Sequence, residues 1–106
     1  MTTLISPQIL DDVAFDKDGY MENAHAWTPE IGQAIAAHEG LVLTDRHWVV
    51  IRFVRAEYDR SGEAPTLRKI TKTSGVDTKE IYQLFPGGPA KLAAKVAGLK
   101  KPTGCI

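Results

Sequence analysis

Asp45-Arg-His-Trp-Val-Val-Ile-Arg-Phe-Val-Arg-Ala-Glu-Tyr-Asp-Arg60 is the most apolar helical stretch of the chain. Thr44 precedes it as a good N-cap residue, and Asp45 complements the positive end of the helix dipole. Large apolar residues recur at helical spacing along one face and widen onto the next: Trp48, Ile51, Val54 and Tyr58, with Val50 and Phe53. A stripe this broad predicts that the helix is the central one of a bundle.

Capping residues and helix breakers predict four further helices around this one. The predicted helices, with the residue that caps or begins each, are 29–39 after Thr28, 67–73 after Thr66, 78–85 after Asp77, and 90–97 after Pro89. Apolar residues also alternate on either side of Asp18-Gly19, which predicts a short β-hairpin between Val13 and Met21. The predicted fold is mainly α: a small helical bundle with a helix-turn-helix-like hairpin, a short N-terminal β-hairpin and a flexible C-terminal arm.

The C-terminal stretch Gly98-Leu-Lys-Lys-Pro-Thr-Gly-Cys-Ile106 does not suit a helix, because Gly98 ends the preceding one and Pro102 blocks another. We therefore expect a helical domain over 1–97 and a mobile arm over 98–106. The arm carries the only cysteine of the protein, Cys105. Fully extended from Gly98, the arm reaches roughly 26 Å. This geometry suits a thiol that is carried to partner proteins, whereas the plain alternative is a small buried hydrophobic residue or part of a disordered chain end.

Composition limits the function classes. The 106 residues fit one domain, 43% are hydrophobic and 25% charged, and the formal net charge is zero. A broad basic footprint for nucleic acid is therefore missing from the sequence. No apolar run has the length of a membrane helix, and the first residues lack a basic region, so we expect no membrane association and a cytoplasmic protein.

The remaining chemical patterns are weak. The three histidines are isolated from one another, and the sequence has no phosphate-binding loop and no nucleophile motif, so we expect no metal, no cofactor and no autonomous catalysis. The helix pair around Ser74-Gly75-Val76 leaves a DNA-binding regulator as an alternative. Its first helix is basic, but the would-be recognition helix presents Asp77 and Glu80, which DNA would repel.

Four stretches together resemble the DsrC/TusE family. They are Phe15-Asp-x-Asp-Gly-Tyr20, His47-Trp48-x-x-x-Arg52-Phe-x-Arg55-x-x-Tyr58, Tyr82-x-Leu-Phe-Pro-x-Gly-Pro-Ala90-Lys91 and Ala97-Gly-Leu-x-Lys-Pro-Thr-Gly-Cys105. The resemblance covers nearly the whole chain. It implies a small helical domain with an N-terminal hairpin and a mobile arm, whose penultimate cysteine accepts sulfane sulfur as a persulfide and passes it on.

The chain departs from one branch of that family. Proteins resembling DsrC, the partner of dissimilatory sulfite reductase, carry a second cysteine at the position of Ala94, and an insertion in the segment that is 75–80 here. Both departures are typical of the TusE-like branch, in which a single-cysteine persulfide carrier serves 2-thiouridine formation at the tRNA wobble position. The DsrC-like role in sulfite reduction or sulfur oxidation remains the alternative, as does a regulatory role of other single-cysteine relatives.

The resemblance implies that the Cys105 thiolate attacks a donor persulfide and delivers the sulfur to the next protein. The expected partners are therefore the donor and acceptor proteins of a relay, with tRNA involved only indirectly. Arg52, Arg55, Lys91 and Lys101 are the candidates to line a docking surface or to hold the arm. The alternative for each is an ordinary solvated charge on a helix face.

Overall fold

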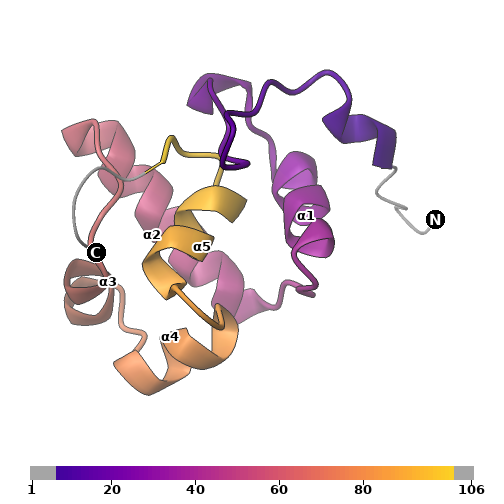
Figure 1. The fold of residues 1–106 in the computed structure, drawn as a ribbon. Helices are drawn as coiled ribbons and strands as arrows, with labels where there is room; N and C mark the ends of the chain where they lie inside the picture. Colours follow the sequence, from indigo (N-terminus) through magenta and orange to yellow (C-terminus); the bar gives the residue numbers. More distant parts are fainter. Residues whose placement is uncertain (1–6, 102–106) are drawn as a thin grey trace.

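A computed structural model describes residues 7–101 of the chain. Two short 3₁₀ helices, η1 (Pro7–Leu10) and η2 (Ala24–Ala26), precede five α-helices in this part (Figure 1). The α-helices are α1 (Pro29–His38), α2 (Asp45–Ser61), α3 (Leu67–Thr73), α4 (Thr78–Leu84) and α5 (Pro89–Val96). The mainly α fold class is confirmed. None of the helices between residues 7 and 101 has the length and apolarity required to cross a membrane.

Three of the predicted helix starts are confirmed by hydrogen bonds to the capping side chain. The Thr28 hydroxyl accepts from Ile31 N at 3.3 Å, and the Thr66 hydroxyl accepts from Lys69 N at 3.2 Å. Asp77 Oδ1 accepts from Glu80 N at 2.8 Å. Each side chain pairs with an amide that the first turn of a helix leaves without an internal partner, which fixes where the helix begins.

The predicted centre of the bundle is wrong, because α5 and not α2 lies in the middle. α5 packs against α1, α2, α3 and α4, whereas α2 packs mainly against α5 and α3. The helix surrounded on most sides carries small side chains, with Ala90, Ala93 and Ala94 all buried, so neighbouring helices can approach it closely. The wide stripe of α2 reflects large side chains that cover α5.

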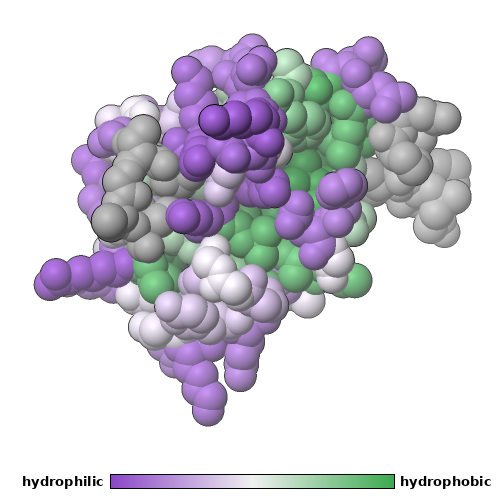
Figure 2. Space-filling model, viewed as in Figure 1, coloured by the Kyte–Doolittle hydropathy of each residue, from purple (hydrophilic) through white to green (hydrophobic). Residues whose placement is uncertain are grey.

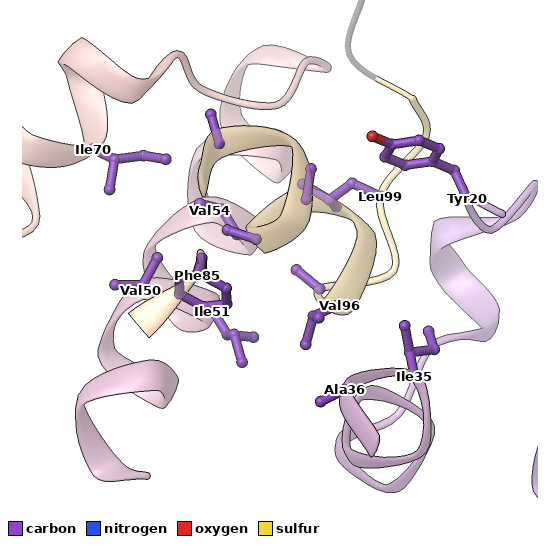
Figure 3. Close-up of a cluster of buried hydrophobic side chains, with 14 of the residues drawn as sticks. Tyr20, Ile35, Ala36, Val50, Ile51, Val54, Ile70, Phe85, Val96 and Leu99 are labelled. Atoms are coloured by element: carbon purple, nitrogen blue, oxygen red, sulfur yellow. The ribbon is translucent and has the colours of Figure 1, made fainter. Parts of the chain in front are cut away.

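The hydrophobic core is built around α5 (Figure 3). Figure 3 shows side chains from α1, α2, α3 and the hairpin around this helix, and Leu99 pointing toward it from the segment that follows. The largest fully buried side chains are Phe85, Met21, Ile51, Ile70, Ile81, Leu99, Val50, Val54, Val76 and Val96. Burial of this apolar set is the main stabilising contribution to the fold.

The predicted hairpin takes a small form. Phe15 and Met21 form a single antiparallel bridge, and Asp16 N donates to Tyr20 O at 2.7 Å. No longer strand forms among residues 7–101. The hairpin lies near the end of α5, while η1 packs on α1 (Figure 1). Hydrophobic surface gathers where η1 and the hairpin meet α1 (Figure 2), around a recess of about 250 Å³ lined in part by Leu10, Phe15 and Ile35.

Polar contacts fix α4, the second helix of the α3–α4 pair, to α2. Arg46 of α2 donates to both carboxylate oxygens of Glu80, at 2.7 and 2.8 Å. The buried His47 ring accepts from Thr44 N at its Nδ1 atom, so Nε2 carries the hydrogen and donates to Leu84 O at 2.8 Å. These contacts occupy Glu80 and the end of α4 with packing, which favours the plain helical-hairpin interpretation over DNA reading.

The packed domain extends beyond the predicted boundary at Ala97. Leu99 has no exposed surface, and Lys101 Nζ lies 2.8 Å from Asp18 Oδ2. Residues 98–101 therefore belong to the domain, and the expectation of an arm that is loose from Gly98 onward is wrong for these four. The rest of the predicted arm, 102–106 with Cys105, lies outside the described residues.

Candidate functional site

The candidate site is the arm root, by which we mean residues 97–101, together with the surfaces beside it. Cys105 itself lies outside the described residues, and Lys101, the last of these, is four residues before it. The contacts of the arm root therefore decide where the described chain ends, four residues before the thiol. Three side chains from distant parts of the sequence hold it.

A tight cap at the end of α5 sets the path of the arm root. Gly98 has a left-handed conformation with φ of +74°. Its amide donates to Lys95 O at 3.1 Å, and the Leu99 amide donates to Ala94 O at 3.0 Å. This pair of bonds satisfies two carbonyl groups at the end of the helix and turns the chain back onto it. The turn directs the Leu99 side chain into the core.

Trp27 packs against the outside of this turn. Its Nε1 atom donates to Val96 O at 2.9 Å, and its ring covers Gly98 so closely that a Cβ added there would overlap Cδ1. The same ring covers Gly32 of α1, where an added Cβ would lie 2.7 Å from Cζ2. Two glycines thus make room for one indole, which joins α1 to the arm root.

Arg55 holds the arm root from the side of α2. Nη1 donates to Ala97 O at 2.7 Å and Nη2 donates to Ala24 O at 3.2 Å. The guanidinium carbon stands 4.3 Å from the centre of the Trp27 ring, within the range of a cation–π contact. Burial lowers the pKa of Arg55, although an arginine still stays protonated at physiological pH. Both hydrogen-bond acceptors are neutral carbonyl groups.

Lys101 is held by the hairpin turn. Its Nζ atom donates to Asp18 Oδ2 at 2.8 Å across the surface of the domain. This hydrogen bond is the main cause that raises the pKa of Lys101 and lowers the pKa of Asp18. Both groups therefore carry their charges at neutral pH, and the contact is an ion pair.

Arg52 lines a groove beside the arm root. The groove has a volume of about 590 Å³, and Trp27, Trp48, Arg52, Arg55 and Asp59 are among its lining residues. The two indole rings lie 6.5 Å apart, centre to centre. The Arg52 side chain is exposed, and it forms no ion pair with any residue between 7 and 101. Tryptophan and arginine are the residues most often found at the energetic centre of protein interfaces.

Lys91 lies elsewhere, at the junction of α3, α4 and α5. It lines a recess of about 180 Å³ together with Leu67, Tyr82 and Pro89, and Tyr82 is 48% exposed. The four cations singled out from the sequence therefore do not converge on one site. Arg55 and Lys101 contact the arm root, Arg52 lines the groove beside it, and Lys91 lies at a separate recess.

Sequence reasoning missed two residues of the arm root. Asp18 is a turn residue by its pattern, and Trp27 is a residue that precedes a helix cap. Neither pattern reveals a partner that lies 83 positions away for Asp18 and 69 for Trp27. The available signal for Asp18 is that it stands in Phe15-Asp-x-Asp-Gly-Tyr20, one of the stretches that resemble the family, whereas Trp27 offers only its place before the cap Thr28. No group of histidine, cysteine, aspartate and glutamate able to hold a metal ion occurs among residues 7–101.

Comparison with known proteins defines the class of protein. The sequence profile of a family described as "DsrC like protein" matches residues 10–106. The NMR structure of Allochromatium vinosum DsrC is similar with a TM-score of 0.80 and 40% identity, over 89% of this chain and 90% of that one. The crystal structure of the oxidized gamma-subunit of the dissimilatory sulfite reductase (DsrC) from Archaeoglobus fulgidus has a TM-score of 0.80 and 35% identity, over 89% and 92%.

Two relatives carry the name of one branch. "Sulfurtransferase TusE" of Yersinia pseudotuberculosis is 40% identical over 98 residues, which are 86% of this chain and 91% of the relative. "Sulfurtransferase TusE homolog" of Haemophilus influenzae is 41% identical over 102 residues, which are 90% and 94%. The chain belongs to the DsrC-like family, and the resemblance found in the sequence is confirmed.

The close contact at Gly98 gives a direct test of the arm root. In Gly98→Ala the new methyl group needs a left-handed backbone and overlaps the Trp27 ring, so we expect the free energy of unfolding to fall by about 2–4 kcal/mol. Gly62→Ala is the matched control, since φ there is +82° but no atom lies within 4 Å. Gly62→Ala should lower the free energy of unfolding by only about 1 kcal/mol. Urea denaturation measures both, and equal effects would contradict the packing of Trp27 on the turn.

Proposed function

We propose that this protein is a sulfur-relay protein that accepts sulfane sulfur as a persulfide on Cys105 and passes it to a downstream protein. The observation that carries the proposal is the match to the DsrC-like family across residues 10–106, with relatives named sulfurtransferase TusE. The chain has one thiol, and it lies four residues beyond a root that the domain holds firmly. The domain thus supplies a base from which a thiol is presented.

The chemical step needs no cofactor. The Cys105 thiolate attacks the outer sulfur of a donor persulfide, a new bond forms between Sγ and that sulfur, and the S–S bond of the donor breaks. The donor leaves as a thiolate, so the persulfide proton stays with the transferred sulfur and no net oxidation occurs. Delivery repeats the exchange, with a thiolate of the acceptor attacking the outer sulfur of the Cys105 persulfide. Cysteine acts as a carrier throughout.

We further propose that the relay serves 2-thiouridine formation in tRNA, with tRNA contacted by a later protein. The support is the single thiol: α5 has Ala94 where the DsrC branch of the family carries a second cysteine, and Ala94 is buried in the core. An arm with one cysteine forms a persulfide but cannot close a disulfide within the chain. The donor and acceptor proteins are the expected partners, in the cytoplasm, where thiols stay reduced.

The proposal also assigns separate tasks to the four cations. Arg55 holds the arm root and Lys101 meets the hairpin, as their contacts indicate. Arg52 is the docking candidate, because it combines exposure, a groove with two tryptophans, and a charge without an ion-pair partner among residues 7–101. A partner that presents an acidic side chain fits this groove. Lys91 remains a second docking candidate at its own recess beside the exposed Tyr82.

The carrier role is tested by measuring whether Cys105 carries an extra sulfur atom in cells. Protein isolated under alkylation-free conditions should include a fraction heavier by one sulfur atom, which a reducing agent removes and which Cys105→Ser lacks. In cells without their own copy, the wild type should restore 2-thiouridine in tRNA and Cys105→Ser should not. A sulfur gain on Cys105→Ser contradicts the carrier role. A persulfide on Cys105 without any effect on 2-thiouridine would contradict only the tRNA branch.

The docking role of Arg52 is tested by charge reversal. Arg52→Glu should lower the fraction of Cys105 persulfide in cells by about tenfold, because a partner carboxylate would then meet a like charge. The rate at which sodium polysulfide loads Cys105 in the purified protein should stay unchanged. Arg68→Glu is the matched control, since Arg68 is exposed on α3 and lines a different recess. Equal fractions of Cys105 persulfide in the two variants would show that the groove is not part of the docking surface.

A further inference from the structure

The hairpin turn that meets Lys101 is a rigid support. Asp16 Oδ1 accepts from Asp18 N at 2.8 Å and from Tyr20 N at 3.0 Å, and Asp16 O accepts from Gly19 N at 3.0 Å. These bonds close the turn on itself from within. The backbone of Asp18 is therefore held in place by the turn, and its carboxylate meets Lys101 from this fixed backbone.

The turn is also fixed to the rest of the domain. Tyr20 and Met21, which follow it, are buried in the core. Gly19 lies against Lys95 of α5, where an added Cβ would be 2.9 Å from Cε. Lys95 in turn pairs with Glu39 next to α1, with its Nζ atom 3.2 Å from Oε2. The turn thus presents Asp18 from a fixed place on the surface, next to the end of α5.

Lys101 is the last point at which the described chain contacts the domain. From the buried Leu99 six residues would remain to the thiol, or roughly 20 Å, but from Lys101 only four remain, or roughly 13 Å. We propose that Asp18 is a positioning residue for Cys105: by holding Lys101, it biases the point and the direction from which the chain continues to the thiol. This inference deepens the proposed sulfur relay and rests on it.

The strength of the ion pair suits this role. Asp18 and Lys101 are both largely exposed, with 37% and 52% of their side-chain surface accessible, so water and salt weaken their attraction. Pairs of this kind change a population about two- to fivefold. The contact therefore biases the direction of the thiol, and a partner protein can still displace Lys101 when it takes the thiol into its own active site.

The first experiment measures the direction bias without any partner. Because Cys105 is the only cysteine, a methanethiosulfonate nitroxide attaches there alone in the full-length protein. The electron paramagnetic resonance spectrum should show a mobile component that is about two- to fivefold larger in Asp18→Asn than in the wild type. Asp12→Asn, at another exposed aspartate, is the matched control and should match the wild type. High salt should move the wild type toward Asp18→Asn and leave Asp18→Asn unchanged.

Charge exchange separates the ion pair from a general loss of structure. Asp18→Lys and Lys101→Asp should each enlarge the mobile component, and the double variant should reduce it again. Recovery should be partial, since Lys17 and Lys95 act on position 18 and repel a lysine there. Spectra of Asp18→Asn that equal the wild type would overturn the proposal. The proposal would also be overturned if the mobile component of the double variant were as large as that of the more mobile single variant.

The second experiment connects the contact to sulfur transfer. The fraction of Cys105 persulfide in cells should fall about two- to fivefold in Asp18→Asn and recover in the charge-exchanged double variant, while loading by sodium polysulfide stays at the wild-type rate. Equal or greater loading in Asp18→Asn overturns the positioning role. A wild-type protein that carries no persulfide in cells would instead contradict the proposed sulfur relay, and the nitroxide spectra would still decide whether Asp18 holds Lys101.

Discussion

The turn at Gly98, where the Leu99 amide donates to Ala94 O, is the constraint on which the rest of the site depends. It folds the chain back onto α5 and places Leu99 in the core, so the helix end and the arm root form one packed unit. Trp27 and Arg55 then bind the carbonyl groups that this turn leaves free, Val96 O and Ala97 O. The buried cap therefore joins α1, α2 and α5 at the place from which the thiol-bearing residues continue.

This arrangement divides the molecule into a fixed support and a short reactive end. Residues 7–101 provide helices, a groove and charged side chains, while we propose that the chemistry of sulfur transfer belongs to Cys105 and to the partner active site. A short segment on a fixed base loses less conformational freedom on docking than a long loose one, which favours a productive encounter. In our proposals Asp18 and Arg52 act on two different parts of that encounter: Asp18 directs the thiol, and Arg52 contacts the partner.

The sequence was sufficient for the helices, because Thr28, Thr66 and Asp77 are local signals whose partners lie three residues away. The sequence was misleading about the centre of the bundle. The wide apolar stripe of α2 reflects its large side chains, whereas the small side chains of α5 allow four helices to pack around that helix. The glycine that suggested a loose arm is the residue that the buried cap requires. Contacts such as the one between Asp18 and Lys101 follow from tertiary packing alone, so no local pattern could predict them.

The packed domain continues through the arm root, which ends four residues before the thiol. Amide hydrogen exchange at Leu99 tests this most directly, because exchange of a buried, hydrogen-bonded amide requires the structure around it to open. The account predicts that the Leu99 amide is protected to the same degree as the core amides of α5. Exchange of Leu99 at the rate of an unstructured peptide, with α5 still protected, would contradict it.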